Sequence, residues 1–284
     1  MKEQGYPILT NGEYIKWRET IEKKYGIYFD ESRVTFLCKS LLDRMRINEI
    51  YSYDDYYHYL SYDSKSGQEW EELVCCLVNN DTKFFRNQPS FSILSDYVLP
   101  ELLSIKSRNF NRIISFWSVG CSSGNETYSL AMTALENYDT DEFYTRVIGS
   151  DINVRLLTKA RKGIYSESEI RYLDTSYRNK YMYPVFLDGS VFYKFTDRVK
   201  DLVSFNFINL FEPDSYRIFM QDIIFFQNVL IYFNKNRRMD IIEKLAGYLV
   251  KGGYLFLSPS DMIDANMPSL EAVHLIDQVV YRKS

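Results

Sequence analysis

Residues 115–129 read Ser-Phe-Trp-Ser-Val-Gly-Cys-Ser-Ser-Gly-Asn-Glu-Thr-Tyr-Ser, and this stretch decides the fold. It predicts an apolar strand over residues 112–119, a tight turn of small residues, and a helix that begins at Asn125. Within the turn, Gly120 and Gly124 let the backbone approach a ligand closely and take dihedral angles that other residues avoid. The helix behind the turn offers free N–H groups and the positive end of its dipole. Such turns are common in α/β proteins, so this one alone indicates only a candidate ligand site.

A second apolar strand, residues 146–151, ends in Asp151. In Rossmann-like sheets an acidic residue about 20 positions past the glycine turn accepts hydrogen bonds from ribose hydroxyls. The turn departs from the G-x-G-x-x-G dinucleotide pattern, and Glu126 in the first turn of the helix would repel a pyrophosphate. The two acids therefore favour a ligand with a ribose and cationic groups but no phosphate, which describes S-adenosylmethionine. An N-cap for a helix that starts near Val154 is an equal alternative role for Asp151.

The composition sets further bounds. A chain of 284 residues is long enough for two domains, and its net charge of −4 gives no overall attraction to nucleic acid. No stretch resembles a signal peptide or a membrane span. Four cysteines without C-x-x-C spacing and two histidines make a zinc site improbable, so we expect no metal. We expect a cytoplasmic monomer that binds no nucleic acid and does not insert into a membrane.

Residues 1–80 predict an all-helical domain, because apolar residues recur at three- and four-residue spacing. The expected helices span residues 14–25, 33–45, 52–62 and 68–78. The second helix carries Arg33, Lys39, Arg44 and Arg46 against Asp43 alone. Such a basic face is a candidate docking surface for an acidic partner, and an ordinary solvated face is the alternative.

Residues 81–111 predict a connecting segment with a helix, and residues 112–284 predict a doubly wound α/β sheet. The connecting helix is expected over 90–103, further strands over 202–210, 221–230 and 253–257, a helix over 237–250 that residues 251–253 stop, and a hairpin over 273–282. Aromatic strand-like runs around the Asp188-Gly189 turn signal indicate a small antiparallel insert at about 178–201. Ligands bind beyond the carboxyl ends of such strands, so Asp151, Asn209 and Asn228 are expected around one crevice.

Four separate segments carry specific motifs. They read NDTKFFR from residue 80, GCSSGNETYS from residue 120, SDINVRLLTKARKGIY from residue 150 and NVLIYF from residue 228. Together, in this order, they resemble the chemotaxis receptor methyltransferases of the CheR type, and the resemblance covers nearly the whole chain. It implies a Rossmann-like methyltransferase sheet with a helical N-terminal domain and a β insert. It also implies transfer of a methyl group from S-adenosylmethionine, leaving S-adenosylhomocysteine, to glutamates on the cytoplasmic helices of a chemoreceptor.

The resemblance also implies a set of cofactor contacts, to which the glycine turn adds Gly120. By position they fall on Asn80, Thr82, Arg86, Glu126, Asp151, Asn209, Leu210, Asn228 and Val229. In this scheme Asp151 accepts from the ribose hydroxyls, Glu126 offsets positive charge at the methionine end, and Asn209 pairs with the adenine edge. Asn80, Thr82 and Asn228 are expected to line the methionine end.

Arg86 and Tyr232 are expected nearest the transferred methyl group. Arg86 would hold the substrate carboxylate by paired N–H bonds, a geometry that lysine cannot copy, and Tyr232 would place its hydroxyl beside the same group. A glutamate has a reference pKa of about 4.3 and is already an anion at pH 7. It can attack a methyl sulfonium without a general base, so catalysis rests on placement of the two bound groups.

The chain departs from the family pattern at three places. The turn continues Asn-Glu-Thr instead of Glu-Glu-Pro, Gln227 replaces the usual arginine, and residues 258–261 read Ser-Pro-Ser-Asp instead of Gly-His-Ser-Glu. Gln227 and the missing histidine are expected to remove charged or titratable groups from the crevice rim. A catalytically altered or inactive cofactor-binding module is therefore the alternative function. The insert shows one clear glycine, Gly189, so we expect no tether for a receptor C-terminal peptide and the basic helix as the main docking surface.

Overall fold

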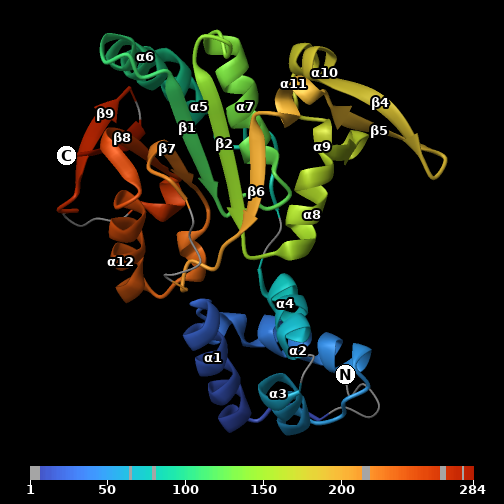
Figure 1. Ribbon diagram of the computed structural model, residues 1–284. Coiled ribbons are helices and arrows are strands. Elements are labelled where there is room, and N and C mark those ends of the chain that lie inside the picture. The colour runs from blue at the N-terminus through green and yellow to red at the C-terminus, as the bar shows by residue number, and fades with distance from the viewer. Residues whose placement is uncertain (1–6, 64–65, 79–80, 213–217, 263–266, 277) are drawn as a thin grey trace.

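The computed structural model describes residues 7–63, 66–78, 81–212, 218–262, 267–276 and 278–284. A helical unit formed by the N-terminal part of the chain faces the end of a β-sheet formed by the remainder (Figure 1). The elements of the helical unit are α1 (Asn11–Tyr25), the 3₁₀ turn η1 (Glu31–Arg33), α2 (Val34–Ile47), α3 (Tyr53–Tyr62) and α4 (Ser66–Leu77). None of the helices in the described ranges is long and apolar enough to cross a membrane.

All four N-terminal helices expected from the sequence occur, with their ends moved by three residues or fewer. Helix α1 begins earlier than its apolar pattern because Thr10 and Glu13 form a capping box, in which each side chain binds the backbone N–H of the other residue. The helices close around an aromatic core in which the Trp17 ring stacks on Tyr56 at 5.4 Å between ring centroids. This core is separate from those of the sheet.

Arg44 corrects the predicted basic face of α2. Its side chain is buried and makes paired hydrogen bonds to Glu69, from Nε to Oε1 at 2.8 Å and from a terminal nitrogen to Oε2 at 2.5 Å. Tyr56 also donates to Glu69, at 2.6 Å. Burial disfavours the Glu69 carboxylate, but these hydrogen bonds outweigh burial and hold the pKa of Glu69 below its usual value. Arg44 thus joins α2, α3 and α4 and cannot belong to an exposed docking surface.

The central sheet has the strand order β6-β2-β1-β7-β8-β10-β9. Its strands are β1 (Ile113–Val119), β2 (Tyr144–Asp151), β6 (Val203–Phe207), β7 (Gln221–Phe226), β8 (Leu249–Leu257), β9 (Leu270–Leu275) and β10 (Gln278–Lys283). The first five strands in the order are parallel, and β10 pairs antiparallel with both of its neighbours. Because β1 lies between β2 and β7, chain connections leave it in both directions, which creates the topological switch point where α/β sheets bind ligands.

Helices cover both faces of the sheet, as a doubly wound fold requires. They are α5 (Gln88–Ile93), the π-helical turn η2 (Leu94–Val98), α6 (Leu99–Arg108), α7 (Asn125–Asn137), α8 (Val154–Lys162) and α12 (Lys235–Ala246). Along β1 the side chains alternate: Phe116 belongs to the core that α5 to α8 complete, whereas Trp117 belongs to the core beneath α12. The connecting helix expected over 90–103 is longer than predicted, because α5, η2 and α6 follow one another without a break.

The β insert has three strands in the order β3-β5-β4. It comprises β3 (Ile164–Ser166), α9 (Glu167–Ile170), α10 (Thr175–Tyr181), β4 (Met182–Leu187), β5 (Ser190–Phe195) and α11 (Asp197–Lys200). The predicted hairpin turn is confirmed, since Asp188 and Gly189 take φ values of 48° and 75° between β4 and β5. Figure 1 shows this hairpin projecting away from the central sheet. Strand β3 was not predicted, because three residues are too few to show the alternation of apolar and polar residues that indicates a strand.

Two predicted boundaries were wrong for reasons of backbone geometry. The strand expected to reach residue 230 ends at Phe226, and Asn228, with a left-handed φ of 60°, turns the chain away from the direction of the strand. Residues 251–253 do not stop a helix: α12 ends at Ala246, and these residues lie inside β8. Gly252, with a φ of 76°, accompanies a register shift between β7 and β8.

The Arg44 contact predicts a large stability effect. Arg44→Ala leaves the Glu69 carboxylate buried without its cation, so we expect the free energy of unfolding to fall by about 3–5 kcal/mol. Urea denaturation followed by circular dichroism measures this change. Lys39→Ala, on the same helix but exposed, is the control and should change stability by less than about 0.5 kcal/mol. Equal effects of the two substitutions would contradict the structural role of Arg44.

Candidate functional site

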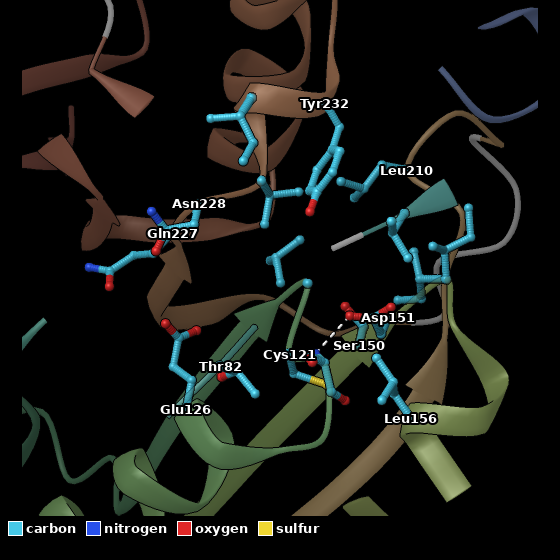
Figure 2. A pocket seen from close by; sticks show the side chains of 18 of the residues that line it. Thr82, Cys121, Glu126, Ser150, Asp151, Leu156, Leu210, Gln227, Asn228 and Tyr232 are labelled. Carbon is cyan, nitrogen blue, oxygen red and sulfur yellow. Dashed lines mark hydrogen bonds between the residues drawn. The ribbon is translucent and has the colours of Figure 1, made fainter. Parts of the chain in front are cut away.

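A pocket lies at the carboxyl ends of β1, β2 and β7, where the sheet meets the helical unit. All the described residues predicted to bind the cofactor or the acceptor line it. They are Thr82, Arg86, Gly120, Glu126, Asp151, Asn209, Leu210, Asn228, Val229 and Tyr232. Asn80 lies outside the described residues. Five separate segments of the sequence thus meet in one pocket, which Figure 2 shows from close by.

The glycine turn forms the floor of the pocket between β1 and β2. The backbone N–H groups of Gly120 and Cys121 both donate to the Ser150 carbonyl, at 2.8 and 2.9 Å. Gly120 has a φ of 75°, and a Cβ atom placed there would lie 2.5 Å from a Val229 methyl group. Only glycine therefore fits this position, and its missing side chain lets Val229 pack directly on the turn.

Asp151 is held at the end of β2 by the turn and by the loop that follows the strand. One carboxylate oxygen accepts from Ser122 N–H at 2.7 Å, drawn as a dashed line in Figure 2, and the other accepts from Asn153 N–H at 2.8 Å. Asn153, not Asp151, caps α8 by accepting from the N–H groups of residues 155 and 156. The N-cap alternative for Asp151 was therefore wrong. Burial raises the pKa of Asp151, and its unused lone pairs remain able to accept from hydroxyls.

Glu126 lies across the pocket from Asp151, on the side of Gln227 and Asn228 (Figure 2). The Ser118 hydroxyl donates to its Oε1 at 2.7 Å. Burial raises the pKa of Glu126 to about 7, the Ser118 bond and the charge of Arg86 oppose this shift, and the charge of Asp261 adds to it. The pocket thus presents one acid at each side, an arrangement that suits a ligand with hydroxyls at one end and a cation at the other.

Arg86 reaches the pocket from a loop that two aromatic residues anchor. Phe84 is buried against Tyr165 and Phe195, and Phe85, with a φ of 50°, donates its N–H to the Ser129 hydroxyl at 3.0 Å. The guanidinium of Arg86 donates to the Asp81 carbonyl at 2.9 Å and lies 3.7 Å from the Asp81 carboxylate. Because its side chain is 40% exposed, an anionic ligand can draw it away from Asp81.

The helical unit contributes a wall of the pocket that sequence reasoning missed. Tyr25 and Ile27 line it, and Ile27 forms an antiparallel bridge with Phe233. The N–H of Tyr28 donates to the Tyr232 carbonyl at 2.8 Å. Figure 2 shows the Tyr232 hydroxyl pointing into the pocket. The sequence shows Gly26, which ends α1 with a φ of 73°, but it does not show where the residues beside it pack.

Asn209 lines the pocket and also joins the two units of the chain. Its Nδ2 donates to the Lys24 carbonyl at 3.0 Å and to Glu212 at 3.2 Å, and its Oδ1 accepts from Phe211 N–H at 3.0 Å. These contacts connect the helical unit to the loop after β6. Donation from Nδ2 to an adenine edge would require one of them to break, whereas Oδ1 can accept a second hydrogen bond. Its pairing with adenine stays a prediction.

Gln227 lines the pocket. Its side chain is largely buried and donates to the Ser90 hydroxyl at 2.9 Å, toward α5. Asp261 is also buried, and it accepts from the backbone of Asn228. Pro259, which stands in place of the usual histidine, is exposed. The expected loss of charged or titratable groups at the rim stays a prediction.

The predicted docking residues other than Arg44 divide into two places. Arg33 precedes α2 and is half-buried, with its guanidinium over the rings of Phe29 at 4.7 Å and Tyr232 at 5.8 Å. Lys39 and Arg46 are seven residues apart on α2 and thus share a helix face, with Lys39 exposed and Arg46 beside Asp43 at 3.5 Å. Arg33 lies six positions before Lys39, and this spacing does not place the two side chains on the same face of a helix.

Comparisons with known proteins agree with this architecture. Residues 12–77 match the family model described as CheR methyltransferase, all-alpha domain, and residues 80–278 match that described as CheR methyltransferase, SAM binding domain. Chemotaxis protein methyltransferase 2 of Vibrio cholerae is 32% identical over 89% of this chain and 86% of its own length. A probable chemotaxis protein methyltransferase of Rhizobium etli is 29% identical over 89% of this chain and 92% of its own length.

The raised pKa of Glu126 predicts a pH-dependent cofactor affinity. A pKa of about 7 leaves Glu126 partly protonated near neutrality, whereas the ammonium group of S-adenosylhomocysteine favours the carboxylate. Below pH 7 the ligand must displace a proton, so we expect the dissociation constant to rise by up to about tenfold per pH unit, and to level off above pH 8. Isothermal titration calorimetry between pH 6 and 8.5 measures this. Glu126→Gln should bind more weakly and without the pH dependence; a flat wild-type profile would contradict the assignment.

Proposed function

This chain belongs to the CheR family of S-adenosylmethionine-dependent methyltransferases, and we propose that it methylates glutamate side chains on the cytoplasmic helices of chemoreceptors. The relatives that share most of its length are themselves chemotaxis protein methyltransferases. The observation that supports the proposal best is the single pocket that holds Asp151, Glu126 and Arg86. We propose that the protein acts in the cytoplasm, where such receptor helices lie.

The residues of the pocket fit the cofactor. When bound, S-adenosylmethionine supplies an electrophilic methyl group on a sulfonium. Asp151 would accept from the ribose hydroxyls, and Glu126 would face the ammonium at the opposite side. Gly120 supports this fit, because its lack of a Cβ atom lets Val229 pack on the turn while both residues line the pocket. Thr82, Leu210 and Val229 would complete the walls.

Arg86 and Tyr232 would act on the acceptor. The Arg86 guanidinium would leave Asp81 and bind the acceptor carboxylate with two N–H groups, which fixes the plane of the carboxylate. The Tyr232 hydroxyl would donate to the same carboxylate. Since glutamate is ionised at neutral pH, these residues need only orient it and exclude water, and no side chain must remove a proton.

Replacement of Arg86 tests this proposal. We expect Arg86→Ala to lower kcat/KM for transfer of a labelled methyl group to receptor membranes by at least a hundredfold, equivalent to about 2.7 kcal/mol of transition-state stabilisation. Binding of S-adenosylhomocysteine should survive in part. Arg86→Lys should recover little, because an ammonium cannot make the paired bonds.

Arg171 offers a matched control, since it is exposed and stacks on Tyr172 at 4.5 Å outside the set of pocket-lining residues. Arg171→Ala should leave transfer unchanged. Undiminished transfer by Arg86→Ala would contradict the assigned role. Wild-type protein that binds the cofactor analogue yet leaves no alkali-labile label on receptors would favour the alternative, a cofactor-binding module without turnover.

We also propose that the face of α2 formed by Lys39 and Arg46 docks the acidic receptor helices. The double substitution Lys39→Glu with Arg46→Glu should lower kcat/KM for receptor methylation by about tenfold at low salt, with a smaller effect at high salt, and leave cofactor binding unchanged. Lys16→Glu with Lys23→Glu, on α1, is a charge-matched control. Receptor pulldown that depends strictly on the receptor's C-terminal peptide would instead assign docking to the β insert.

A further inference from the structure

Asn228 occupies an unusual conformation at a position that lines the pocket. It follows β7 with a φ of 60°, in the left-handed region that asparagine adopts more often than most residues but that only glycine enters without a Cβ penalty. Val229 and the short 3₁₀ turn η4 (Leu230–Tyr232) follow it, and Val229 and Tyr232 line one wall of the pocket. The conformation of Asn228 therefore sets the direction of the whole segment.

Asp261 supplies that support from η5 (Pro259–Asp261), the turn that follows β8. Its side chain is buried, and one carboxylate oxygen accepts from the backbone N–H of Asn228. The backbone N–H groups of Val229 and Leu230 oppose the rise that burial causes in the pKa of Asp261. The start of the segment after Asn228 thus turns its N–H groups toward this acid.

Ser258 and Ser260 add further hydrogen bonds to Asp261 and Asn228. The Ser258 hydroxyl donates to Asp261 Oδ2 at 2.7 Å and lies 3.3 Å from Asn228 N–H, from which it accepts. The Asn228 side-chain amide donates to the Ser260 hydroxyl at 3.2 Å. Residues 258–261, which depart from the family pattern, therefore form a self-consistent hydrogen-bonded cluster around Asn228.

The cluster reaches the pocket through the neighbours of Asn228. Val229 packs on Gly120 so closely that a Cβ atom there would be 2.5 Å from its methyl group. Tyr232 follows within η4 and accepts through its carbonyl from Tyr28 of the helical unit. A shift of the Asn228 backbone would move both contacts, one at the glycine turn and one at the wall of the pocket that faces the helical unit.

We propose that Asp261 is a positioning residue for the cofactor site, which holds Asn228 in its left-handed conformation and thereby sets the places of Val229 and Tyr232. Asp261 itself does not touch the cofactor. The inference rests on the cofactor pocket that the proposed function uses, and it is independent of which protein receives the methyl group.

A double-mutant cycle on S-adenosylhomocysteine binding tests this inference. Asp261→Asn replaces the carboxylate that accepts from the Asn228 N–H and the Ser258 hydroxyl by a neutral amide, which is a weaker acceptor, so we expect the dissociation constant to rise at least tenfold. In an Asn228→Gly background the same change should cost less than threefold, because glycine takes the left-handed angle without support. Asp261→Glu restores the carboxylate and should bind within about threefold of wild type. Asp240→Asn, an exposed acid of α12, is the control and should bind as wild type does.

Two results would overturn the inference: Asp261→Asn that binds within twofold of wild type, or an equal loss in both backgrounds. If Asp261→Asn does not fold, Ser258→Ala takes its place in the cycle, with an expected loss of at least threefold that Asn228→Gly abolishes. Because the readout is ligand binding alone, wild-type protein that binds the ligand but methylates no receptor would refute the proposed function and leave this inference standing.

Discussion

The pocket depends on how the carboxyl ends of β1 and β2 are joined. The N–H groups of Gly120 and Cys121 share the Ser150 carbonyl, and Ser122 N–H binds Asp151 in the next position. These bonds fold the turn back onto β2. A residue with a side chain at position 120 would not fit there, because Val229 occupies the space that its Cβ atom would need. The same turn therefore fixes Asp151 and forms the floor of the pocket at the end of β1.

The site also depends on contact between the two units of the chain. Ile27 pairs with Phe233, Tyr28 N–H binds the Tyr232 carbonyl, and Asn209 binds the Lys24 carbonyl. These contacts place the helical unit across the same pocket that the sheet forms. Cofactor binding and the position of α2 are therefore physically linked, since the backbone that holds Tyr232 also holds the segment between α1 and α2.

The parts of this structure that short-range patterns encode could be predicted from sequence, and those set by tertiary contact could not. Apolar periodicity gave the helices of the N-terminal unit, and the glycine turn with Asp151 gave the switch-point crevice. The burial of Arg44 was not predictable, because its partner Glu69 and Tyr56, which also donates to Glu69, lie 25 and 12 residues away on other helices. Tyr25 and Ile27 were missed for the same reason: nothing local shows that the end of α1 faces the sheet.

Charge distribution connects the pocket to its ligand. Burial and the nearby charge of Asp261 both disfavour the ionisation of Glu126, and Arg86, whose charge opposes this effect, is turned toward Asp81. Burial also raises the pKa of Asp151 at the other side of the pocket, although backbone N–H groups oppose that rise. The ionisation of Glu126 therefore depends on which charges lie beside it. A cation bound beside Glu126 would favour its carboxylate, which suits the positively charged cofactor of this family.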